Sequence, residues 1–410
     1  EVAWKTLLKL VHDKNRFVGW DAVKALRLTY SVLPDMNVVW NEFVRLCRNK
    51  DSSIRWNSVV ALGEVYADVP NKADAWNTYL KIIYSSESIV RSVSLLTLGK
   101  IFAHIPNKES AWSTILILSS NRDPAVRALI AFNIGCAYHH VPDKAIAWNT
   151  LLNLSNDPDS DVRDKVVQSL GKIYVDIPDK EAAWNTLLNL INDLDSYVQM
   201  RALQSLGDVY DHIPDKADAW KILLNRSNDP DLYVRMGVVQ TLGNVYAHAP
   251  ETGVAWNTFQ NFSKDKNGLV RIEALRAIGL AYPFIANKKL AKDTILGLTQ
   301  DIDPTVRIFA FHTAGTVSIQ IACDLDNDNL FRSELENAMR FFEQSFLESE
   351  LLPEREKMDN NPAQICFPLY RAFYAVTFQK KTLKGTVEQF ISEAKNAIID
   401  KTYYCPYYKE

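Results

Sequence analysis

Arginine recurs at a fixed interval along the sequence, and such a row of guanidinium groups could do two kinds of chemistry. The positions, 36 residues apart or a multiple of that, are Arg55, Arg91, Arg127, Arg163, Arg235, Arg271 and Arg307. An acid stands four residues before most of them, at Asp51, Glu87, Asp123, Asp159, Asp231 and Asp303. A free basic row would bind phosphates, whereas guanidinium groups on a buried side need carboxylate partners. Because the acids accompany the arginines, we expect a ladder of structural ion pairs, each arginine with its own acid. Gly19 and Gln199 replace arginine and leave gaps.

Histidine and cysteine could also do chemistry, as metal ligands or nucleophiles. Four of the seven histidines keep to one place in the interval, at His104, His140, His212 and His248. Single histidines in adjacent repeats, stacked about 10 Å apart, are too distant to share a metal. The five cysteines form no CxxC pair, which is typical of reduced thiols in the cytoplasm. They are Cys47, Cys136, Cys323, Cys366 and Cys405. No GxSxG, HExxH or phosphate-binding glycine motif occurs. We therefore expect no metal, no cofactor and no enzymatic activity.

A repeat of 36 residues positions all of these side chains. Tryptophan marks it at Trp4, Trp40, Trp76, Trp112, Trp148, Trp184, Trp220 and Trp256. Proline follows the same interval from Pro34 to Pro250, and glycine from Gly63 to Gly315. Self-similarity at a period between 20 and 50 residues indicates a solenoid or a related array. Nine units therefore cover residues 1–324, the ninth being degenerate, and residues 325–410 leave the period.

Each unit is expected to be a pair of helices. In residues 145–180, apolar residues at helical spacing from Ala147 to Leu154 predict a first helix. The turn residues 156–159 break it, and Asp159 is placed to cap a second apolar stripe that begins at Val162. The repeated glycine lies inside this second helix, where it costs about 1 kcal/mol relative to alanine. A shared close approach of a neighbouring helix would explain that cost. The sequence thus predicts an all-α solenoid.

The repeat resembles a known family. The run DPDSDVRDKVVQSLGKI in residues 157–173, with copies beginning at Asp123, Asp229 and Asp303, is similar to HEAT repeats, especially the short subtype first named in phycobilisome lyases. The resemblance covers about four-fifths of the chain. It implies a right-handed superhelix whose second helices line the concave face, and a scaffold that holds other proteins. Tetratricopeptide repeats are the rival assignment, but their Leu-Gly pair after the tryptophan is absent here.

Some relatives of that family are enzymes, and their motifs are missing. The deoxyhypusine hydroxylase type binds iron through His-Glu pairs, and this sequence has no His-Glu dipeptide. Alkylpurine glycosylases present a basic concave face. With 46 Lys and Arg against 49 Asp and Glu, the net charge here is −3, which argues against a nucleic-acid partner or a polybasic membrane surface. No uninterrupted apolar stretch approaches the roughly 18 residues of a membrane span. We expect neither nucleic acid nor membrane among the partners.

A partner-binding surface is predicted on the second helices of units one to four. Positions 20 and 24 of each unit should point away from the core, and in this half five of these eight positions hold large apolar residues along a diagonal, the other three being Ser92, Ala128 and Lys24. The candidate binding residues are Trp20, Trp56, Val60, Leu96 and Phe132. An apolar patch outside a soluble protein usually marks an interaction site. The alternative is that the superhelix curls enough to bury these residues between neighbouring second helices.

Residues 325–410 are expected to form a helical cap or a separate docking module. Helical patterns run over 329–350, 362–378 and 384–399. A cap would seal the last repeat, as solenoids require. The tail TYYCPYYKE either packs back on the cap or continues into a longer natural chain. The chain begins in mid-array without methionine, so we expect a fragment or a trimmed chain.

Two functions follow from this sequence. The first is a non-enzymatic, cytoplasmic scaffold that binds a protein or peptide on the concave face. The second is the repeat arm of a larger signalling or lyase-type assembly, whose catalytic domain lies outside this chain. The oligomeric state stays open at this point.

Overall fold

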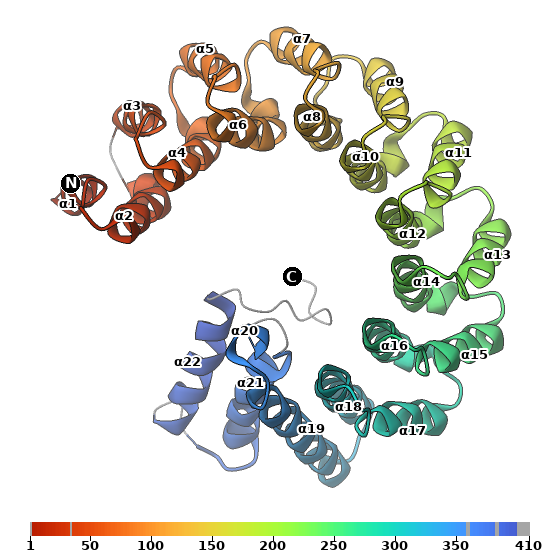
Figure 1. Cartoon of the computed structure of the whole chain (residues 1–410). Helices are drawn as coiled ribbons and strands as arrows, with labels where there is room; N and C mark the ends of the chain where they lie inside the picture. The colour runs from red at the N-terminus through yellow and green to blue at the C-terminus, as the bar shows by residue number, and fades with distance from the viewer. Residues whose placement is uncertain (1, 33–34, 358–360, 382–384, 400–410) are drawn as a thin grey trace. The chain divides into compact units, whose positions relative to one another are not determined.

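Helices account for the regular structure of the molecule. The computed structural model describes residues 2–32, 35–357, 361–381 and 385–399, and it places no strand among them. The chain divides into two compact units, residues 1–205 and 206–410 (Figure 1). The all-α prediction is confirmed, and so are helix pairs that repeat about every 36 residues.

The first unit consists of successive helix pairs. Their bounds are α1 (Val2–Leu10), α2 (Arg16–Thr29), α3 (Met36–Leu46), α4 (Ser52–Val65), α5 (Lys72–Ile83), α6 (Ser88–Ile101), α7 (Lys108–Leu118), α8 (Pro124–Ala137), α9 (Lys144–Leu154), α10 (Ser160–Ile173), α11 (Lys180–Ile191) and α12 (Ser196–Val209), the last of which ends in the second unit. Second helices pack on the second helices of neighbouring pairs, whereas each first helix packs mainly on the second helix of its own pair.

The second unit continues with α13 (Lys216–Arg226), α14 (Leu232–Val245), α15 (Thr252–Phe262), α16 (Gly268–Ala281), α17 (Lys288–Leu298) and α18 (Pro304–Cys323). It ends with α19 (Asp328–Glu350), α20 (Glu354–Lys357), α21 (Ala363–Thr377) and α22 (Thr386–Ile399). Helices α19, α21 and α22 match the three helical patterns expected there, and the short α20 was not expected. Helix α18 is long and apolar enough to cross a membrane, but 61% of its most apolar window is buried inside the protein. A buried core helix passes the same test of length and composition.

Each helix pair has defined ends. Asp159 caps α10, as predicted, because its carboxylate accepts from the backbone N–H groups of Asp161 and Val162. At the other end, most second helices tighten into a 3₁₀ turn that begins with a buried aromatic, such as Tyr174 in the turn Tyr174–Asp176. Lys180 then donates to the carbonyl of Tyr174 and lies 5.5 Å above its ring. This lysine, which was not predicted from the sequence, satisfies carbonyls that the helix end leaves free.

The repeated tryptophans and glycines serve packing. All eight tryptophans of the repeat are buried, with Trp256 the most exposed at 9%. The close approach predicted at the glycines is confirmed. A Cβ on Gly135 would lie 2.9 Å from the backbone Cα of Ser169 in the next second helix. Ser169 also donates to the carbonyl of Ala131, so the two helices are joined at this point by both shape and hydrogen bonding.

The arginine ladder exists, but its carboxylates differ from those predicted. The aspartates four residues before the arginines cap helices, as Asp123 does for α8, whereas the side chain of Glu87 makes no capping hydrogen bond. Six of the seven ladder arginines instead reach a carboxylate beyond their own repeat, whereas Arg91 donates to the carbonyl of Ser85. The pairs are Arg127–Asp157, Arg163–Asp193, Arg235–Asp265 and Arg271–Asp301, at 2.7 to 2.8 Å, while Arg55 approaches Glu87 at 3.6 Å and Arg307 reaches Glu348 on α19 at 3.0 Å. The ladder therefore ties repeats to one another.

The end of the array is closed by α19, which packs along α18. Phe342 of α19 fills the space beside Gly315, where a Cβ would lie 2.6 Å from its ring. Ser345 donates to the carbonyl of Ile308. These contacts, together with the Arg307 pair, repeat the relations between successive second helices, so α19 covers the face of α18 that a further repeat would cover.

Candidate functional site

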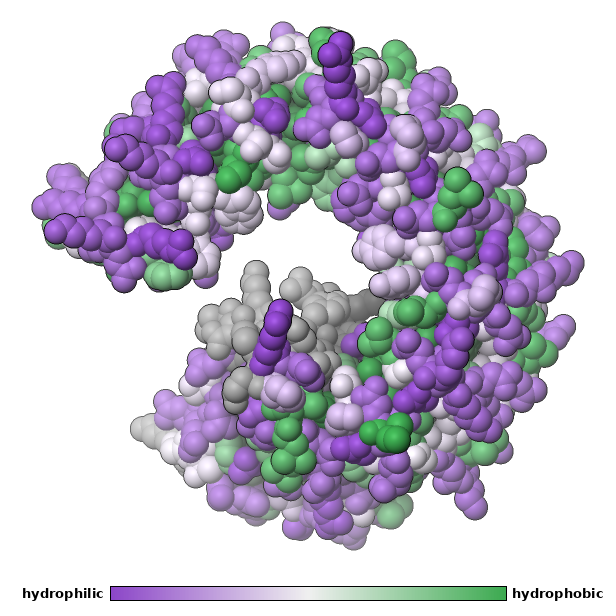
Figure 2. Space-filling view, viewed as in Figure 1, coloured by the Kyte–Doolittle hydropathy of each residue, from purple (hydrophilic) through white to green (hydrophobic). Residues whose placement is uncertain are grey.

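The second helices of residues 1–205 carry the candidate site. Within this unit they lie side by side along the inside of a curve, with the first helices outside (Figure 1). We call the side formed by α2, α4, α6, α8 and α10 the inner face. On the face shown in Figure 2, apolar side chains reach the inner edge over α6 and α8, whereas the outer edge is mostly polar.

The residues predicted to bind a partner lie in a row on this inner face. Trp20, Trp56 and Leu96 are 41%, 43% and 41% exposed, and Val60 and Phe132 are half-buried. We call these five residues the apolar track. Burial between neighbouring helices, the alternative considered above, does not occur at the first three. Whether the apolar track binds a partner stays a prediction.

Position 20 is less exposed further along the array. It holds Ala128, Asp164, Met200 and Ile272, which are buried, and Ser92 and Met236, which are half-buried. The expectation that this position points away from the core in every unit is therefore wrong. Only in the first two units does it carry an indole, and there α2 and α4 leave an open pocket beside it.

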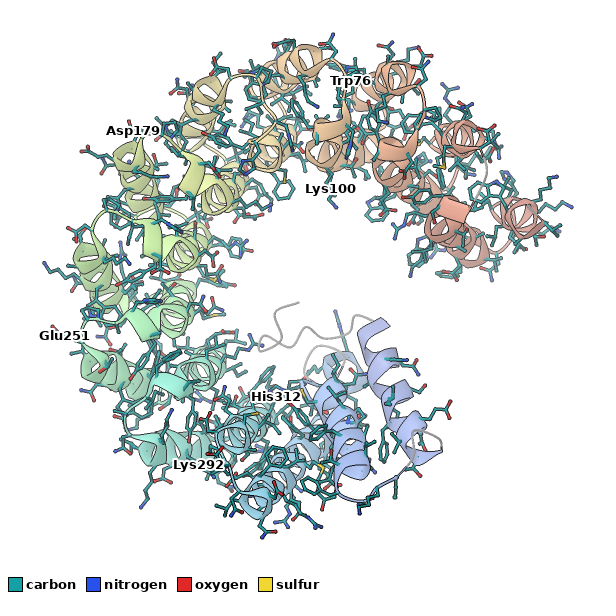
Figure 3. The ribbon with its side chains drawn as sticks, turned by 180° about the vertical axis from the view of Figure 1, so that it is seen from behind. Trp76, Lys100, Asp179, Glu251, Lys292 and His312 are labelled. Atoms are coloured by element: carbon teal, nitrogen blue, oxygen red, sulfur yellow. The ribbon has the colours of Figure 1, made fainter. Side chains whose placement is uncertain are left out.

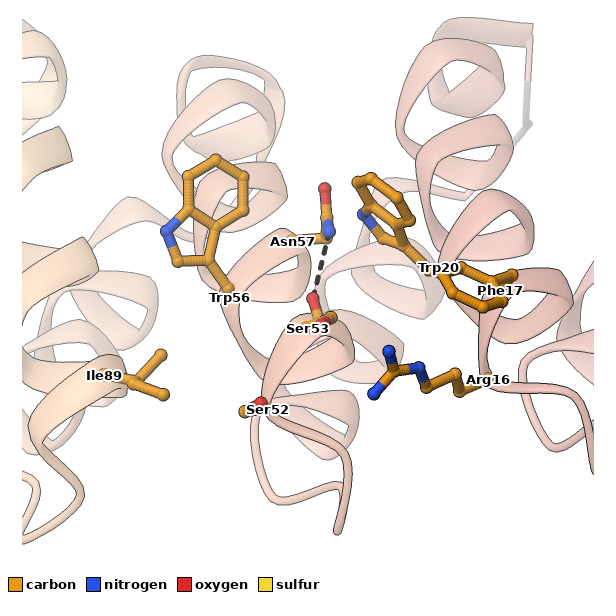
Figure 4. A pocket seen from close by; sticks show the side chains of 8 residues that line it. All are labelled: Arg16, Phe17, Trp20, Ser52, Ser53, Trp56, Asn57 and Ile89. Atoms are coloured by element: carbon orange, nitrogen blue, oxygen red, sulfur yellow. Dashed lines mark hydrogen bonds between the residues drawn. The ribbon is translucent and has the colours of Figure 1, made fainter. Parts of the chain in front are cut away.

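The pocket between α2 and α4 has a volume of about 380 Å³. Its lining residues are Arg16, Phe17, Trp20, Ser52, Ser53, Trp56, Asn57 and Ile89. Figure 4 shows the two indoles on separate helices with Asn57 between them. Asn57 is buried, and its amide donates to the carbonyl of Ser53 at 2.9 Å. The pocket is thus lined by two indole rings, with the fixed amide of Asn57 between them.

A guanidinium lies at the edge of this pocket. Arg16 is exposed, and its guanidinium carbon lies 4.9 Å from the centre of the Phe17 ring. Among the described residues it makes no ion pair. Phe17 is itself 56% exposed. Sequence reasoning missed both residues because they precede the position on which it relied, although each lies within one helical turn of Trp20.

The inner face turns polar at α10, where a buried carboxylate is held by three donors. Asp164 accepts from Gln168 at 2.7 Å, from Lys165 at 3.1 Å and from Arg201 of α12 at 3.3 Å. It was expected to be exposed. One of its two cations, Arg201, comes from the next repeat, which the sequence of one unit does not show. The carboxylate has its full set of donors within the protein, so we assign this cluster to structure.

A thiol and an imidazole also meet, in the second unit. The Sγ of Cys366 lies 3.5 Å from Nε2 of His312, both residues are buried, and Cys366 lines a pocket of about 260 Å³. The histidines of the repeat lie elsewhere, for example His248, whose ring is 3.9 Å from Asp211. Within the described ranges, no three His, Cys, Asp or Glu side chains are grouped so as to hold a metal.

Comparison with known proteins identifies the fold. Residues 113–207 match the family model of HEAT repeats. No curated protein matches the sequence. The structure of yeast importin-β, Kap95p, is similar with a TM-score of 0.53 and 12% identity, and the match covers 97% of this chain and 62% of that one. This chain therefore has the fold of a HEAT-like α-solenoid and spans about three-fifths of the length of importin-β.

Two further solved structures are similar at lower scores. YibA of Escherichia coli has a TM-score of 0.47 and 15% identity, and the match covers 74% of this chain and 98% of that one. A complex of Kap95 with Nup1 has a TM-score of 0.44 and 13% identity, and the match covers 96% of this chain and 67% of that one.

Proposed function

We propose that this HEAT-like solenoid is a non-enzymatic, cytoplasmic scaffold that binds a protein or peptide on the inner face of residues 1–205. The observation that carries the proposal is the apolar track, in which Trp20, Trp56 and Leu96 stand exposed on three neighbouring helices. HEAT repeats typically mediate protein–protein interaction. On the pattern of residues 157–173, we further propose that the repeats belong to the short phycobilisome-lyase subtype.

The energetics favour these tryptophans as anchors. An indole left two-fifths exposed keeps much apolar surface in contact with water, and burying that surface under a partner is favourable. Tryptophans at the centre of interfaces contribute roughly 2–4 kcal/mol each when removed. The other tryptophans of the repeat are buried and stabilise the fold, so two exposed indoles on adjacent helices have no comparable structural role.

The proposal is tested by capturing partners from source lysate and then titrating the purified partner. The variant Trp20→Glu, Trp56→Glu is compared with the wild type. Its control is Val38→Glu, Ile117→Glu, which adds two charges at exposed apolar positions of the first helices α3 and α7. We expect affinity for the partner to fall at least about 30-fold in the tryptophan variant, which corresponds to about 2 kcal/mol, and to stay unchanged in the control.

Both variants are first compared with the wild type by circular dichroism and thermal unfolding. Equal helicity separates a loss of binding from a loss of structure. If the tryptophan variant retains full affinity for every purified partner, the inner face of residues 1–205 is not the binding site and the proposal fails.

A further inference from the structure

We propose that the occupant of the inner face is an acidic amphipathic α-helix, whose apolar stripe lies on the apolar track and whose carboxylates meet cations on both sides of it. The proposal deepens the function proposed above and rests on it. It starts from the charge distribution of the face, which differs from that of the whole chain. Helices α2, α4, α6, α8 and α10 contain ten Lys or Arg and four Asp or Glu, whereas the chain carries a net charge of −3.

Four exposed cations border the apolar track. Arg16 lies one turn before Trp20 on α2, and Lys24 lies one turn after it. Lys100 follows Leu96 by one turn on α6, on the inner side (Figure 3). Lys172 of α10 lies 4.1 Å from the ring centre of Phe132. Among the described residues, none of these four side chains makes an ion pair.

The acids of the same region leave this positive charge uncompensated. Glu64 is paired with Arg27 at 3.3 Å, and Asp164 is paired with Lys165 and Arg201. The other acids on these five helices are Asp21 and Asp161. The remaining arginines are engaged elsewhere, since Arg55 and Arg127 belong to the ladder. Clustered, exposed cations without partners raise the energy of the free protein slightly, and an anionic ligand lowers it.

The geometry of the apolar track favours a helix over an extended chain. An amphipathic helix presents an apolar stripe with charged residues along both edges. The track has cations on both edges too, Arg16 on one side and Lys24, Lys100 and Lys172 on the other. In an extended chain, successive side chains point to opposite faces, so carboxylates next to apolar anchors would point away from the surface.

The length of the occupant follows from the spacing of the second helices. The track crosses from α2 to α8, which is three helix-to-helix steps. At roughly 8–10 Å per step the distance is about 24–30 Å. A helix that rises 1.5 Å per residue covers this with about 16–20 residues. A binding segment of that size is short enough to be made as a peptide.

The test uses four fluorescein-labelled peptides of 18 residues and measures their anisotropy with the full chain. All four carry the same leucine and phenylalanine stripe at helical spacing. The flanking residues are glutamate, glutamine or lysine, and a fourth peptide is the glutamate version with two internal prolines that prevent a helix. We expect the glutamate peptide to bind at least about ten-fold tighter than the glutamine peptide, and the lysine and proline peptides to bind weakest. Its affinity should fall as salt is raised, because exposed charges are screened.

A charge-reversal variant tests the cations without touching the tryptophans. In Lys24→Glu, Lys100→Glu, the glutamate peptide should lose about ten-fold or more in affinity and the lysine peptide should gain. The matched control is Lys9→Glu, Lys81→Glu, which makes the same change at exposed positions of α1 and α5, on the first helices. This control should leave both affinities unchanged.

The outcomes separate this inference from the function on which it rests. Equal binding of the glutamate, glutamine and lysine peptides, or tightest binding of the lysine peptide, overturns the acidic partner but leaves a binding face. Equal binding of the proline peptide overturns the helix. If no peptide binds while Trp20→Glu, Trp56→Glu still abolishes capture of a protein, the occupant is a folded surface and the inference fails alone. If the peptides and the captured protein bind the Trp20→Glu, Trp56→Glu variant as tightly as the wild type, both proposals fail.

Discussion

Arg163 of one repeat donates two hydrogen bonds, each of 2.7 Å, to the carboxylate of Asp193 in the next repeat. The same guanidinium also donates to the carbonyls of Asp157 and Pro158 in its own loop. The arginine therefore joins the turn of one helix pair to the turn of the following one. Both side chains are about nine-tenths buried, at 13% and 8% exposure. A bidentate pair of this kind fixes the register between repeats as well as adding stability.

Removing this arginine should destabilise the array by an amount that depends on what replaces it. Arg163→Ala leaves Asp193 buried without a cation, and we expect a loss of about 3 kcal/mol in the free energy of unfolding. Arg163→Gln should cost less, about 1–2 kcal/mol, because an amide can still donate to the loop carbonyl. The chain already contains a glutamine at this position of the repeat, Gln199, and its amide donates to the carbonyl of Asp193.

Urea unfolding followed by circular dichroism measures both variants. Asp193→Asn and the double variant complete a thermodynamic cycle, in which the coupling between the two residues should exceed about 1 kcal/mol. Additive effects of the two single changes would show that the pair contributes nothing beyond its separate parts.

The ladder should also make the free energy of unfolding depend on pH. Burial alone would raise the pKa of Asp157, but hydrogen bonds from Arg127 and from the backbone N–H of Asp159 outweigh it and lower that pKa below its usual range. The same holds for Asp301, beside Arg271. A carboxyl whose pKa is lower in the folded state stabilises the protein above its unfolded pKa of about 3.9. The stabilisation is lost as the pH falls through the lowered folded value.

The measurement compares wild type with Asp157→Asn, Asp301→Asn at pH 6 and at pH 2.5. At pH 6 the wild type should be the more stable by several kcal/mol in total, because both pairs are intact. At pH 2.5, which lies below the unfolded pKa, the difference should shrink, since protonation of these carboxyls then favours the unfolded wild type. A difference in the free energy of unfolding that stays constant between pH 6 and pH 2.5 would contradict the lowered pKa values of these two carboxyls.

The ladder also shows what the sequence could and could not predict. The signals inside one unit, such as the cap Asp159 and the paired apolar stripes of 145–180, were enough for the helices, because caps and amphipathic patterns are local. The partner of Arg163 was assigned wrongly, because it lies 30 residues away and is set by how repeats stack. Asp164 was expected to be exposed for the same reason, since Arg201 comes from the following repeat.

The candidate site, too, could be predicted from the sequence only in part. The periodicity identified positions 20 and 24 of each unit, and Trp20, Trp56 and Leu96 are indeed exposed there. It could not identify Arg16 and Phe17, which line the pocket only because α2 and α4 leave space between them. The tail beyond residue 399 and its Cys405 lie outside the described residues.

The close approach at the repeat's glycine gives a third prediction. Gly135→Ala places a methyl group 2.9 Å from the Cα of Ser169 and against its side chain. Because backbone atoms cannot move aside cheaply, we expect a net loss of about 1–3 kcal/mol in the free energy of unfolding. This would occur although alanine is the better helix former by about 1 kcal/mol.

Gly297→Ala on α17 is the matched control, because nothing lies within 4 Å of the added methyl group. That change should leave stability unaltered or raise it by up to about 1 kcal/mol. Thermal unfolding of both variants distinguishes the two cases. Equal melting temperatures for Gly135→Ala and the wild type would show that α8 and α10 can separate at little cost.

The cysteines should differ strongly in reactivity. Cys323 is exposed at the end of α18, whereas Cys47 is buried, and burial raises the pKa of the Cys47 thiol to about 12. The thiolate is the reactive form, so at pH 8 hardly any of Cys47 is poised to react even when a reagent reaches it. We expect iodoacetamide to alkylate Cys323 at least about 100-fold faster than Cys47, with half-buried Cys136 between them.

Peptide mapping by mass spectrometry follows each thiol separately, including those outside the described residues. Repeating the reaction in strong denaturant provides the control, because the thiols should then react at similar rates. Buried Cys366, next to His312, is the informative case. If it is alkylated as fast as Cys323 in the native protein, its pocket opens to solvent and the imidazole activates the thiol. If it reacts as slowly as Cys47, the contact serves packing.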